Sequence, residues 1–412
     1  MPESSSDSRR LTRFIARQAI FDTKEHVYGY ELLFRSGEEN RCIANDLDDA
    51  NRDVVDNLLN ADAKTLTVGR RAFINCTRDF LVGEYAVLLP KEDVVLEILE
   101  TVEPEAEVLA ACRKLKDLGY VIALDDFVYA EKFRPFVELA DIIKIDFRLS
   151  PPDERRQAVG RFAPFGIRML AEKVETRTEL AEAHESGYVY FQGYFFCQPQ
   201  IVPSRYIPAF KLHYLQILQA ISKPELDRSE IESLIEREVS LCYKLLRFVN
   251  SALFGFTREV KSIGHALNLL GDRAVKKWAM VAAVLGMADN QPNELVLTAL
   301  TRGRCCELLT GRPGARCDQH NMFLLGALSL MEPMLGRPLP EIVAEIALPE
   351  PVRAALLGKL NPYRETLDLI KAYEMGRWSE VSRLALSLSY REDDLSATYV
   401  AAVDWAHKLF QV

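Results

Sequence analysis

The sequence lacks the features that place a chain in a membrane or on nucleic acid. Its longest apolar stretch, residues 278–288, is too short to cross a bilayer, and the Ser-rich N-terminus has no apolar signal-peptide core. The net charge is −9, whereas broad nucleic-acid binders usually present a basic patch. We therefore expect a cytoplasmic protein that makes no membrane contact and binds no nucleic acid directly.

Metal-binding patterns of cysteine and histidine are also missing. The eight cysteines show no metal-ligand spacing, and the six histidines are scattered along the chain. These residues therefore do not predict a zinc site, and we interpret the cysteines as reduced thiols of the core.

The chain does contain two halves of different character. Strand-like and helix-like segments alternate from about residue 12 to about 205, and only helical patterns follow. Residues 15–21 and 27–34 predict an antiparallel strand pair. We expect a (β/α)8 TIM-like barrel with an antiparallel first strand, followed by an all-helical domain. The expected parts are a disordered tail (1–11), the barrel (12–205), a connecting helix (206–224) and the helical domain (225–412).

Polar side chains end seven short apolar runs in the first half. In a (β/α)8 barrel the carboxyl ends of the strands meet at one rim, where the chemistry is carried out. Oxygen ligands of this kind favour Mg²⁺ or Mn²⁺ over zinc, and two such ions with a cationic side chain can hydrolyse a phosphodiester. Arg35 can donate a charge-assisted fork to phosphate. The strand-end residues are Glu31, Asn75, Glu97, Asp125 with Asp126, Lys144, Glu172 and Gln192.

Eight ordered motifs resemble the EAL family of cyclic di-GMP phosphodiesterases. They lie at residues 17–22, 30–35, 75, 97–100, 125–127, 144–146, 171–176 and 192–194. The resemblance implies cyclic di-GMP as ligand and pairing of barrels into a homodimer. It implies a two-metal site for Mg²⁺ or Mn²⁺, with Glu31, Asn75, Glu97, Asp125, Asp126 and Glu172 as ligands. Lys144, with Glu172 and Asp126, would position the attacking water. Arg35 and Gln192 would serve the substrate, and Glu100 and Asp146 would support the loops.

The chain departs from the family pattern beside these ligands. Glu-Ala-Leu is here Glu31-Leu32-Leu33, and the Gly-Thr-Gly that usually follows Asp-Asp-Phe is here Val128-Tyr129-Ala130. Leu99 stands in place of Thr, and Lys173 in place of Gly. Loss of the glycines predicts a stiffer loop that could misplace metal and substrate, and a shift of about 1 Å can lower a rate roughly 100-fold.

The second half resembles the HDOD module, an all-helical relative of the HD-type phosphohydrolases that lacks their His-Asp metal pair. The resemblance rests on residues 245–254 and 261–271. Residues 326–330, Gly-Ala-Leu-Ser-Leu, stand where such a pair would be. The pattern predicts separate helices at 263–270 and 272–287 and one helix at 322–335. The resemblance implies docking of an unidentified signalling protein rather than catalysis in this half.

Three functions are compatible with these residues. The complete set of acids with Lys144 favours metal-dependent hydrolysis of one phosphodiester of cyclic di-GMP to the linear dinucleotide. The altered loop at 128–130 favours a catalytically inactive cyclic di-GMP receptor. The third alternative is a scaffold whose barrel binds nothing and whose helical half recruits partners.

Overall fold

The computed structural model describes residues 13–36, 65–197, 209–223, 225–250, 260–288, 291–311, 317–346 and 348–410. The expected tail at 1–11 lies outside these residues, as does the side chain of Arg35. The contacts divide the chain into two compact units. One comprises Met1–Phe195 with Lys371–Val400, and the other comprises Phe196–Ile370 with Ala401–Val412.

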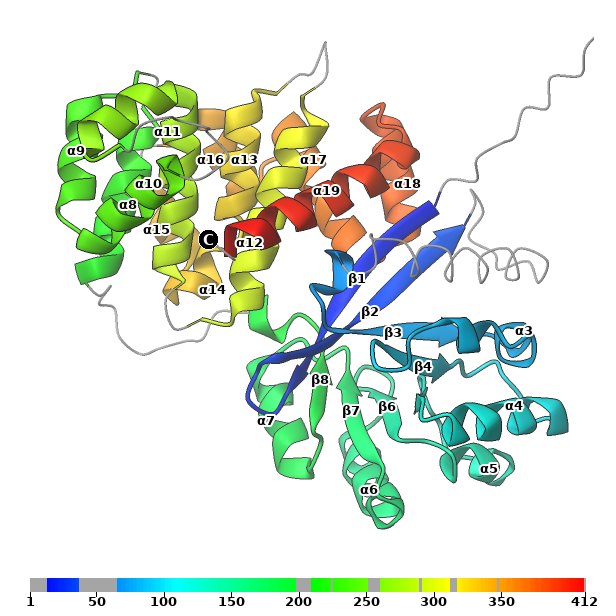
Figure 1. Ribbon diagram of the computed structural model, residues 1–412. Coiled ribbons are helices and arrows are strands. Elements are labelled where there is room, and N and C mark those ends of the chain that lie inside the picture. The colour runs from blue at the N-terminus through cyan, green and yellow to red at the C-terminus, as the bar shows by residue number, and fades with distance from the viewer. Residues whose placement is uncertain are drawn as a thin grey trace, which may run out of the picture. The chain divides into compact units, whose positions relative to one another are not determined.

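The first unit is built on a closed barrel of eight strands in sequence order (Figure 1). β1 pairs antiparallel with both β2 and β8, and every other neighbouring pair is parallel. The expected barrel with an antiparallel first strand is therefore confirmed. The strands are β1 (Arg13–Asp22), β2 (Val27–Ser36), β3 (Arg71–Cys76), β4 (Val94–Ile98), β5 (Val121–Leu124), β6 (Ile142–Asp146), β7 (Arg168–Glu172) and β8 (Tyr190–Gln192).

Strand formation follows from continuous apolar runs that are buried on both faces. All five residues of β4 and of β6 are buried, as expected for parallel strands covered by helices. The barrel interior is filled by side chains from seven strands: Ile20, Phe73, Val95, Ala123, Ile142, Leu170 and Tyr190. The connecting helices are α3 (Arg78–Val82), α4 (Ala106–Asp117), α5 (Arg134–Val137), α6 (Pro152–Phe162) and α7 (Arg177–Ser186), with short 3-10 turns at Tyr85–Leu88, Glu131–Phe133, Ala163–Phe165 and Phe195–Cys197.

The segment Lys371–Val400 belongs to the barrel unit although it comes from the far end of the chain. The Tyr373 hydroxyl accepts a hydrogen bond from the Ile15 backbone N–H at 3.3 Å and donates one to the Ile15 carbonyl at 3.1 Å. The ring of Tyr373 also packs against Trp378 and Tyr399. A single buried side chain therefore satisfies both backbone groups of one β1 residue.

The described residues from 209 onward form helices joined by turns and coil and contain no strand, which confirms the expected all-helical half. The helices of the second unit are α8 (Ala209–Ile221), α9 (Arg228–Glu236), α10 (Val239–Val249), α11 (Ile263–Met287), α12 (Asn293–Leu309), α13 (Gln319–Leu328), α14 (Met331–Leu335), α15 (Leu339–Glu345) and α16 (Glu350–Leu356). α17 (Pro362–Glu374) and α19 (Glu392–Phe410) have residues in both units, and α18 (Trp378–Ser387) lies in the first. None of the described helices is long and apolar enough to span a membrane.

One of the predicted helix breaks is confirmed and one predicted helix is not. Gly271, whose φ of 72° is non-helical, separates the helices predicted at 263–270 and 272–287, which share the label α11. The single helix predicted at 322–335 is wrong, because the chain breaks between α13 and α14 at Leu330. The glycine at the position of the absent His-Asp pair has a packing role: a Cβ on Gly326 would lie 2.6 Å from the Cα of Gly303.

Candidate functional site

The strand ends bring the predicted polar residues to one rim of the barrel. Asn75 on β3 pairs in register with Glu97 on β4, and Asp146 on β6 pairs with Glu172 on β7. Glu31 lies on β2, opposite Gln18 of β1. Parallel strands in register place their carboxyl ends side by side, so residues more than a hundred positions apart become neighbours.

Lys144 lies at the centre of this group and is completely buried. Its Nζ is 2.7 Å from a carboxylate oxygen of each of Glu97, Asp125 and Glu172, and 3.3 Å from Glu31 Oε2. Four carboxylates therefore surround one ammonium group. We call these five residues the Lys144 cluster.

Burial makes the excess negative charge of the Lys144 cluster costly. It raises the pKa of Glu97 well above its usual range, although Lys144 acts in the opposite direction. It also raises the pKa of Glu172 to about 8, again against the effect of Lys144. Burial alone would lower the pKa of Lys144, but the surrounding carboxylates, Glu172 foremost, raise it well above the ordinary value. Lys144 therefore stays cationic, and the acids need further positive charge or protons.

The oxygen atoms of the site fit a hard divalent cation. Among the described residues, the buried oxygens Asn75 Oδ1, Glu97 Oε2, Glu172 Oε2 and Gln192 Oε1 have no hydrogen-bond partner. Carboxylate and amide oxygens are the ligands that Mg²⁺, Mn²⁺ and Ca²⁺ prefer. Within the described residues, no group of three acidic, thiol or imidazole side chains has the spacing that would hold a metal ion. The carboxylates of the Lys144 cluster converge on the ammonium.

Gln192 orients Glu31 at the edge of the Lys144 cluster. Its Nε2 donates to Glu31 Oε2 at 2.6 Å and to Gln18 Oε1 at 3.0 Å. The role of Gln192 toward substrate stays a prediction. Sequence reasoning missed Gln18, which gave no signal beyond its place in a matching motif.

A second ammonium group, that of Lys173, holds the acids that lie outside the Lys144 cluster. Its Nζ is 3.3 Å from each Asp126 oxygen and also contacts Asp146 Oδ2. Burial would raise the pKa of Asp146, but hydrogen bonds from Lys173 and from the Arg148 backbone N–H outweigh it and lower the pKa. Asp126 is thus positioned beside Lys173 rather than beside Lys144. The sequence feature that relates to this contact is Lys173 itself, which stands in place of the family's glycine.

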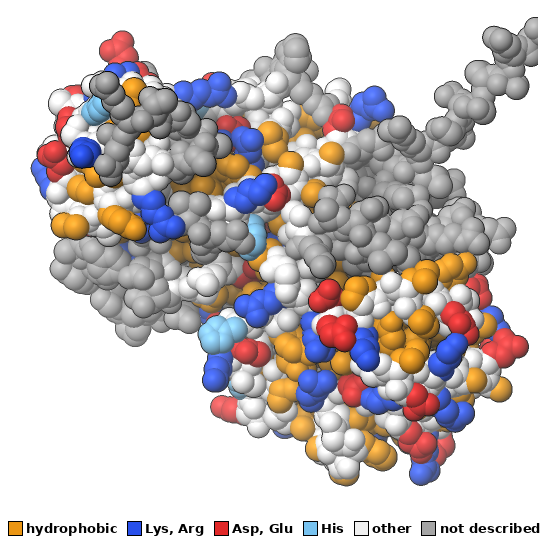
Figure 2. Space-filling model, in the orientation of Figure 1, with side chains coloured by type: hydrophobic (Ala, Val, Ile, Leu, Met, Phe, Trp, Pro, Cys, Tyr) orange, Lys and Arg blue, Asp and Glu red, His pale blue; other side chains and the backbone are white. Residues whose placement is uncertain are grey.

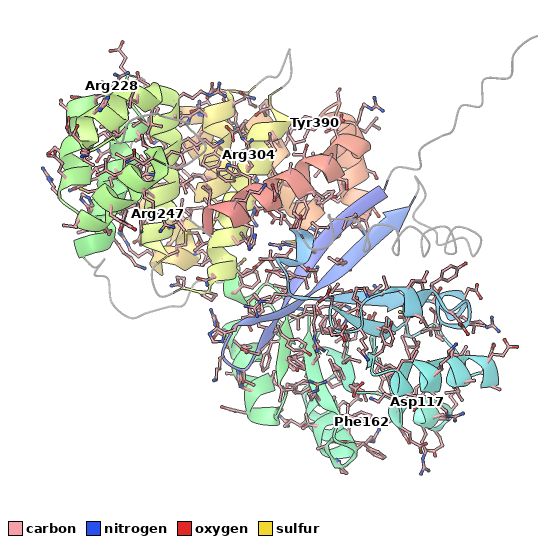
Figure 3. The ribbon with its side chains drawn as sticks, viewed as in Figure 1. Asp117, Phe162, Arg228, Arg247, Arg304 and Tyr390 are labelled. Atoms are coloured by element: carbon pink, nitrogen blue, oxygen red, sulfur yellow. The ribbon has the colours of Figure 1, made fainter. Side chains whose placement is uncertain are left out.

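The loop after Asp126 is anchored without glycine. The Phe127 N–H donates to the Lys144 carbonyl at 3.1 Å, and the Phe127 ring packs edge-on against Phe162, the α6 residue labelled in Figure 3. Residues 128–130 are described and none of them has a positive φ. The stiffer loop expected from the missing glycines therefore adopts ordinary backbone conformations.

Two further predicted residues are Glu100 and Arg35. Glu100 is exposed on the turn after β4. Arg35 has its backbone on β2 opposite Phe14, but its side chain lies outside the described residues. Their assigned roles stay predictions. In the view of Figure 2, acidic and basic side chains are interspersed over the surface that the described residues form.

Comparison with known proteins gives the class of the chain. A model of the EAL domain matches residues 18–199, and a model of the HDOD domain matches residues 207–346. The chain is 34% identical over 406 residues to the uncharacterized protein YuxH of Bacillus subtilis, covering 96% of this chain and 98% of YuxH. The chain belongs to the family of proteins that join an EAL domain to an HDOD domain.

One relative has a named activity. The cyclic di-GMP phosphodiesterase CdgJ of Vibrio cholerae is 32% identical over 402 residues, covering 97% of this chain and 93% of CdgJ. Among solved structures, the Klebsiella pneumoniae BlrP1 manganese/cyclic di-GMP complex is 22% identical, with a TM-score of 0.38 over 46% of this chain and 56% of that chain. The Bacillus subtilis YkuI complex with cyclic di-GMP and calcium is 20% identical, with a TM-score of 0.38 over 56% and 73%.

Proposed function

We propose that the barrel is a phosphodiesterase that requires a divalent cation, Mg²⁺ or Mn²⁺, and cleaves one phosphodiester bond of cyclic di-GMP to give the linear dinucleotide. The observation that carries the proposal is the Lys144 cluster, in which four carboxylates at buried strand ends exceed the positive charge available to them. The similarity over nearly the whole length of CdgJ, a cyclic di-GMP phosphodiesterase, supports the choice of substrate.

The acids and Asn75 would hold the cation. Bound ions of this kind polarise phosphoryl oxygens and lower the pKa of water. Glu31, Asn75, Glu97 and Asp125 contribute oxygens from four neighbouring strand ends, with Asp126 and Glu172 completing the set. Gln192 keeps Glu31 in position through its 2.6 Å hydrogen bond.

Lys144 and Glu172 would position and deprotonate the attacking water. Lys144 stays protonated, so its ammonium can donate to the water or to a phosphoryl oxygen without losing its charge. Glu172 Oε2 has no hydrogen-bond partner among the described residues, and with a bound cation keeping the carboxylate ionised it would accept the proton of the water. The water oxygen would then bond to phosphorus as the bond from phosphorus to the ribose oxygen breaks, and the leaving oxygen would take up the proton that Glu172 accepted.

Two finer parts of the proposal concern partners. The HDOD-like unit would dock a signalling protein, because Gly326 serves helix packing where a catalytic relative would carry a metal pair. The barrel would pair into a homodimer by its resemblance to the family.

Glu100 and Asp146 would support the loops around the substrate. Asp146 accepts hydrogen bonds from the Arg148 and Leu149 backbone N–H groups at 2.6 and 3.1 Å.

One observation favours the receptor as a second candidate. The Lys173 ammonium contacts Asp126, a predicted metal ligand, and this contact withdraws a carboxylate from a two-metal site. A barrel altered in this way could bind cyclic di-GMP without cleaving it.

The direct test is incubation of the purified full chain with cyclic di-GMP and Mn²⁺, followed by chromatography of the products. We expect linear dinucleotide, which disappears with chelator and falls at least about 100-fold in Glu31→Gln. Glu107→Gln is the matched control, because Glu107 is an exposed glutamate of α4 that pairs with Arg78 at 2.9 Å. Binding without product would refute the enzyme in favour of the receptor, and absence of binding would leave the scaffold.

A further inference from the structure

Lys173 occupies a backbone position that suits glycine. It follows β7 directly and has a φ of 54°, in the left-handed region that residues with a Cβ rarely adopt. Asp126, across the rim, has a φ of 39°. Two neighbouring residues in strained conformations persist only where the surrounding structure holds them, and such strain gathers at functional sites.

The Lys173 side chain holds this strained pair together. Its Nζ lies 3.3 Å from both oxygens of Asp126 and contacts Asp146, which also accepts two backbone hydrogen bonds. The negative charge of Glu172 acts on Lys173 as well. Lys173 therefore sits among three carboxylates, two of which are predicted metal ligands.

The rim thus contains two ammonium groups that divide the acids between them. Lys144 is fully buried and forms ion pairs with Glu31, Glu97, Asp125 and Glu172. Lys173 has a half-exposed side chain and forms ion pairs with Asp126 and Asp146. The inner group keeps a large excess of negative charge, whereas Asp126 in the outer group is already paired with a positive charge.

We propose that Lys173 is a built-in cation that competes with the second divalent ion at Asp126, so that the site binds one divalent ion strongly and a second one only weakly. This inference rests on the proposed metal site. A divalent ion at Asp126 must displace the ammonium or bind beside it, and like charges at a few ångströms repel. The Asp126 side chain is one-third exposed, which leaves it open to solvent ions.

The test is Mn²⁺ binding to the metal-free full chain, measured by isothermal titration calorimetry and by native mass spectrometry, without substrate. Lys173→Met removes the charge and keeps most of the stem. Lys173→Gly is the second variant, because glycine adopts a positive φ without strain. It provides the same measurement if the Met variant does not fold. The matched control is Lys132→Met, an exposed lysine of the same barrel whose Nζ pairs with Glu103 at 2.7 Å.

The expected result is one tightly bound ion in the parent chain and in Lys132→Met. In Lys173→Met and Lys173→Gly we expect a second ion that binds at least about tenfold more tightly than in the parent. Equal stoichiometry and affinity in all four proteins would overturn the role of Lys173 and leave the proposed enzyme standing. No Mn²⁺ bound by any of them would overturn both proposals.

Discussion

Replacement of Lys144 by methionine tests the charge balance of the site most directly. The change keeps a similar volume but removes the ammonium that contacts the four carboxylates of the Lys144 cluster, three of them at 2.7 Å. Removing one partner of a buried ion pair leaves uncompensated charge, with a typical cost of about 3–5 kcal/mol. We therefore expect the Lys144→Met barrel to lose stability of that order at pH 8 in metal-free buffer.

The pH dependence gives the sign of the effect. Burial raises the pKa of Glu172 to about 8 even with Lys144 in place, so the folded state binds a proton that the unfolded state has released. A raised carboxyl pKa lowers stability as pH rises from the ordinary value near 4.5 toward 8, by at most about 1.4 kcal/mol per pH unit. Without Lys144 more carboxyls follow this pattern. The loss in Lys144→Met should therefore be smaller at pH 6 than at pH 8.

The assay is urea unfolding of the full chain at pH 6 and pH 8, with chelator, followed by circular dichroism. Lys132→Met serves as control, because it removes an exposed lysine with a single carboxylate partner and should change stability by less than about 1 kcal/mol. A Lys144→Met protein within about 1 kcal/mol of the parent at both pH values would refute the view that this ammonium balances the buried acids.

Two further substitutions test the close packing at Gly326 and the hydrogen bonds between Tyr373 and β1. Gly326→Ala would bring a Cβ to 2.6 Å from Gly303, so we expect a loss of about 1–3 kcal/mol in thermal unfolding. Gly160→Ala, where the new Cβ has no atom within 4 Å apart from its chain neighbours and its own helix backbone, should leave stability equal or raise it by up to about 1 kcal/mol. Equal losses in both variants would contradict the close helix contact. Tyr373→Phe removes the hydroxyl that bridges the Ile15 backbone, so we expect about 1 kcal/mol of destabilisation and faster amide exchange in β1, and unchanged exchange there would contradict the bridge.

The barrel and the position of its rim could be predicted because both depend on local patterns. Several strands are short apolar runs followed by a polar side chain at the rim, although β2 continues to Ser36 beyond Glu31 and β6 continues to Asp146 beyond Lys144. The gathering of acids around Lys144 follows from topology alone, since parallel strands align their ends. The all-helical half was likewise readable from its helical periodicity.

What could not be predicted depends on distances between separate loops. The contact of Lys173 with Asp126 spans 47 residues, and nothing in the sequence sets where a long flexible side chain ends. Gln18 presents the same difficulty, because its contribution to the site is the hydrogen bond that it accepts from Gln192. The break between α13 and α14 falls within an apolar stretch without Gly or Pro at the breaking residues, so tertiary packing overrode the local pattern there.

The pairing of Tyr373 with Ile15 has a consequence for how this barrel can be moved between proteins. The matched EAL region ends at residue 199, yet the compact unit that contains the barrel also requires Lys371–Val400. A gene fragment cut at the family boundary would leave the N–H and carbonyl of Ile15 without the Tyr373 hydroxyl that pairs with both. In evolutionary terms, the barrel and residues 371–400 would be inherited together, because one compact unit contains both.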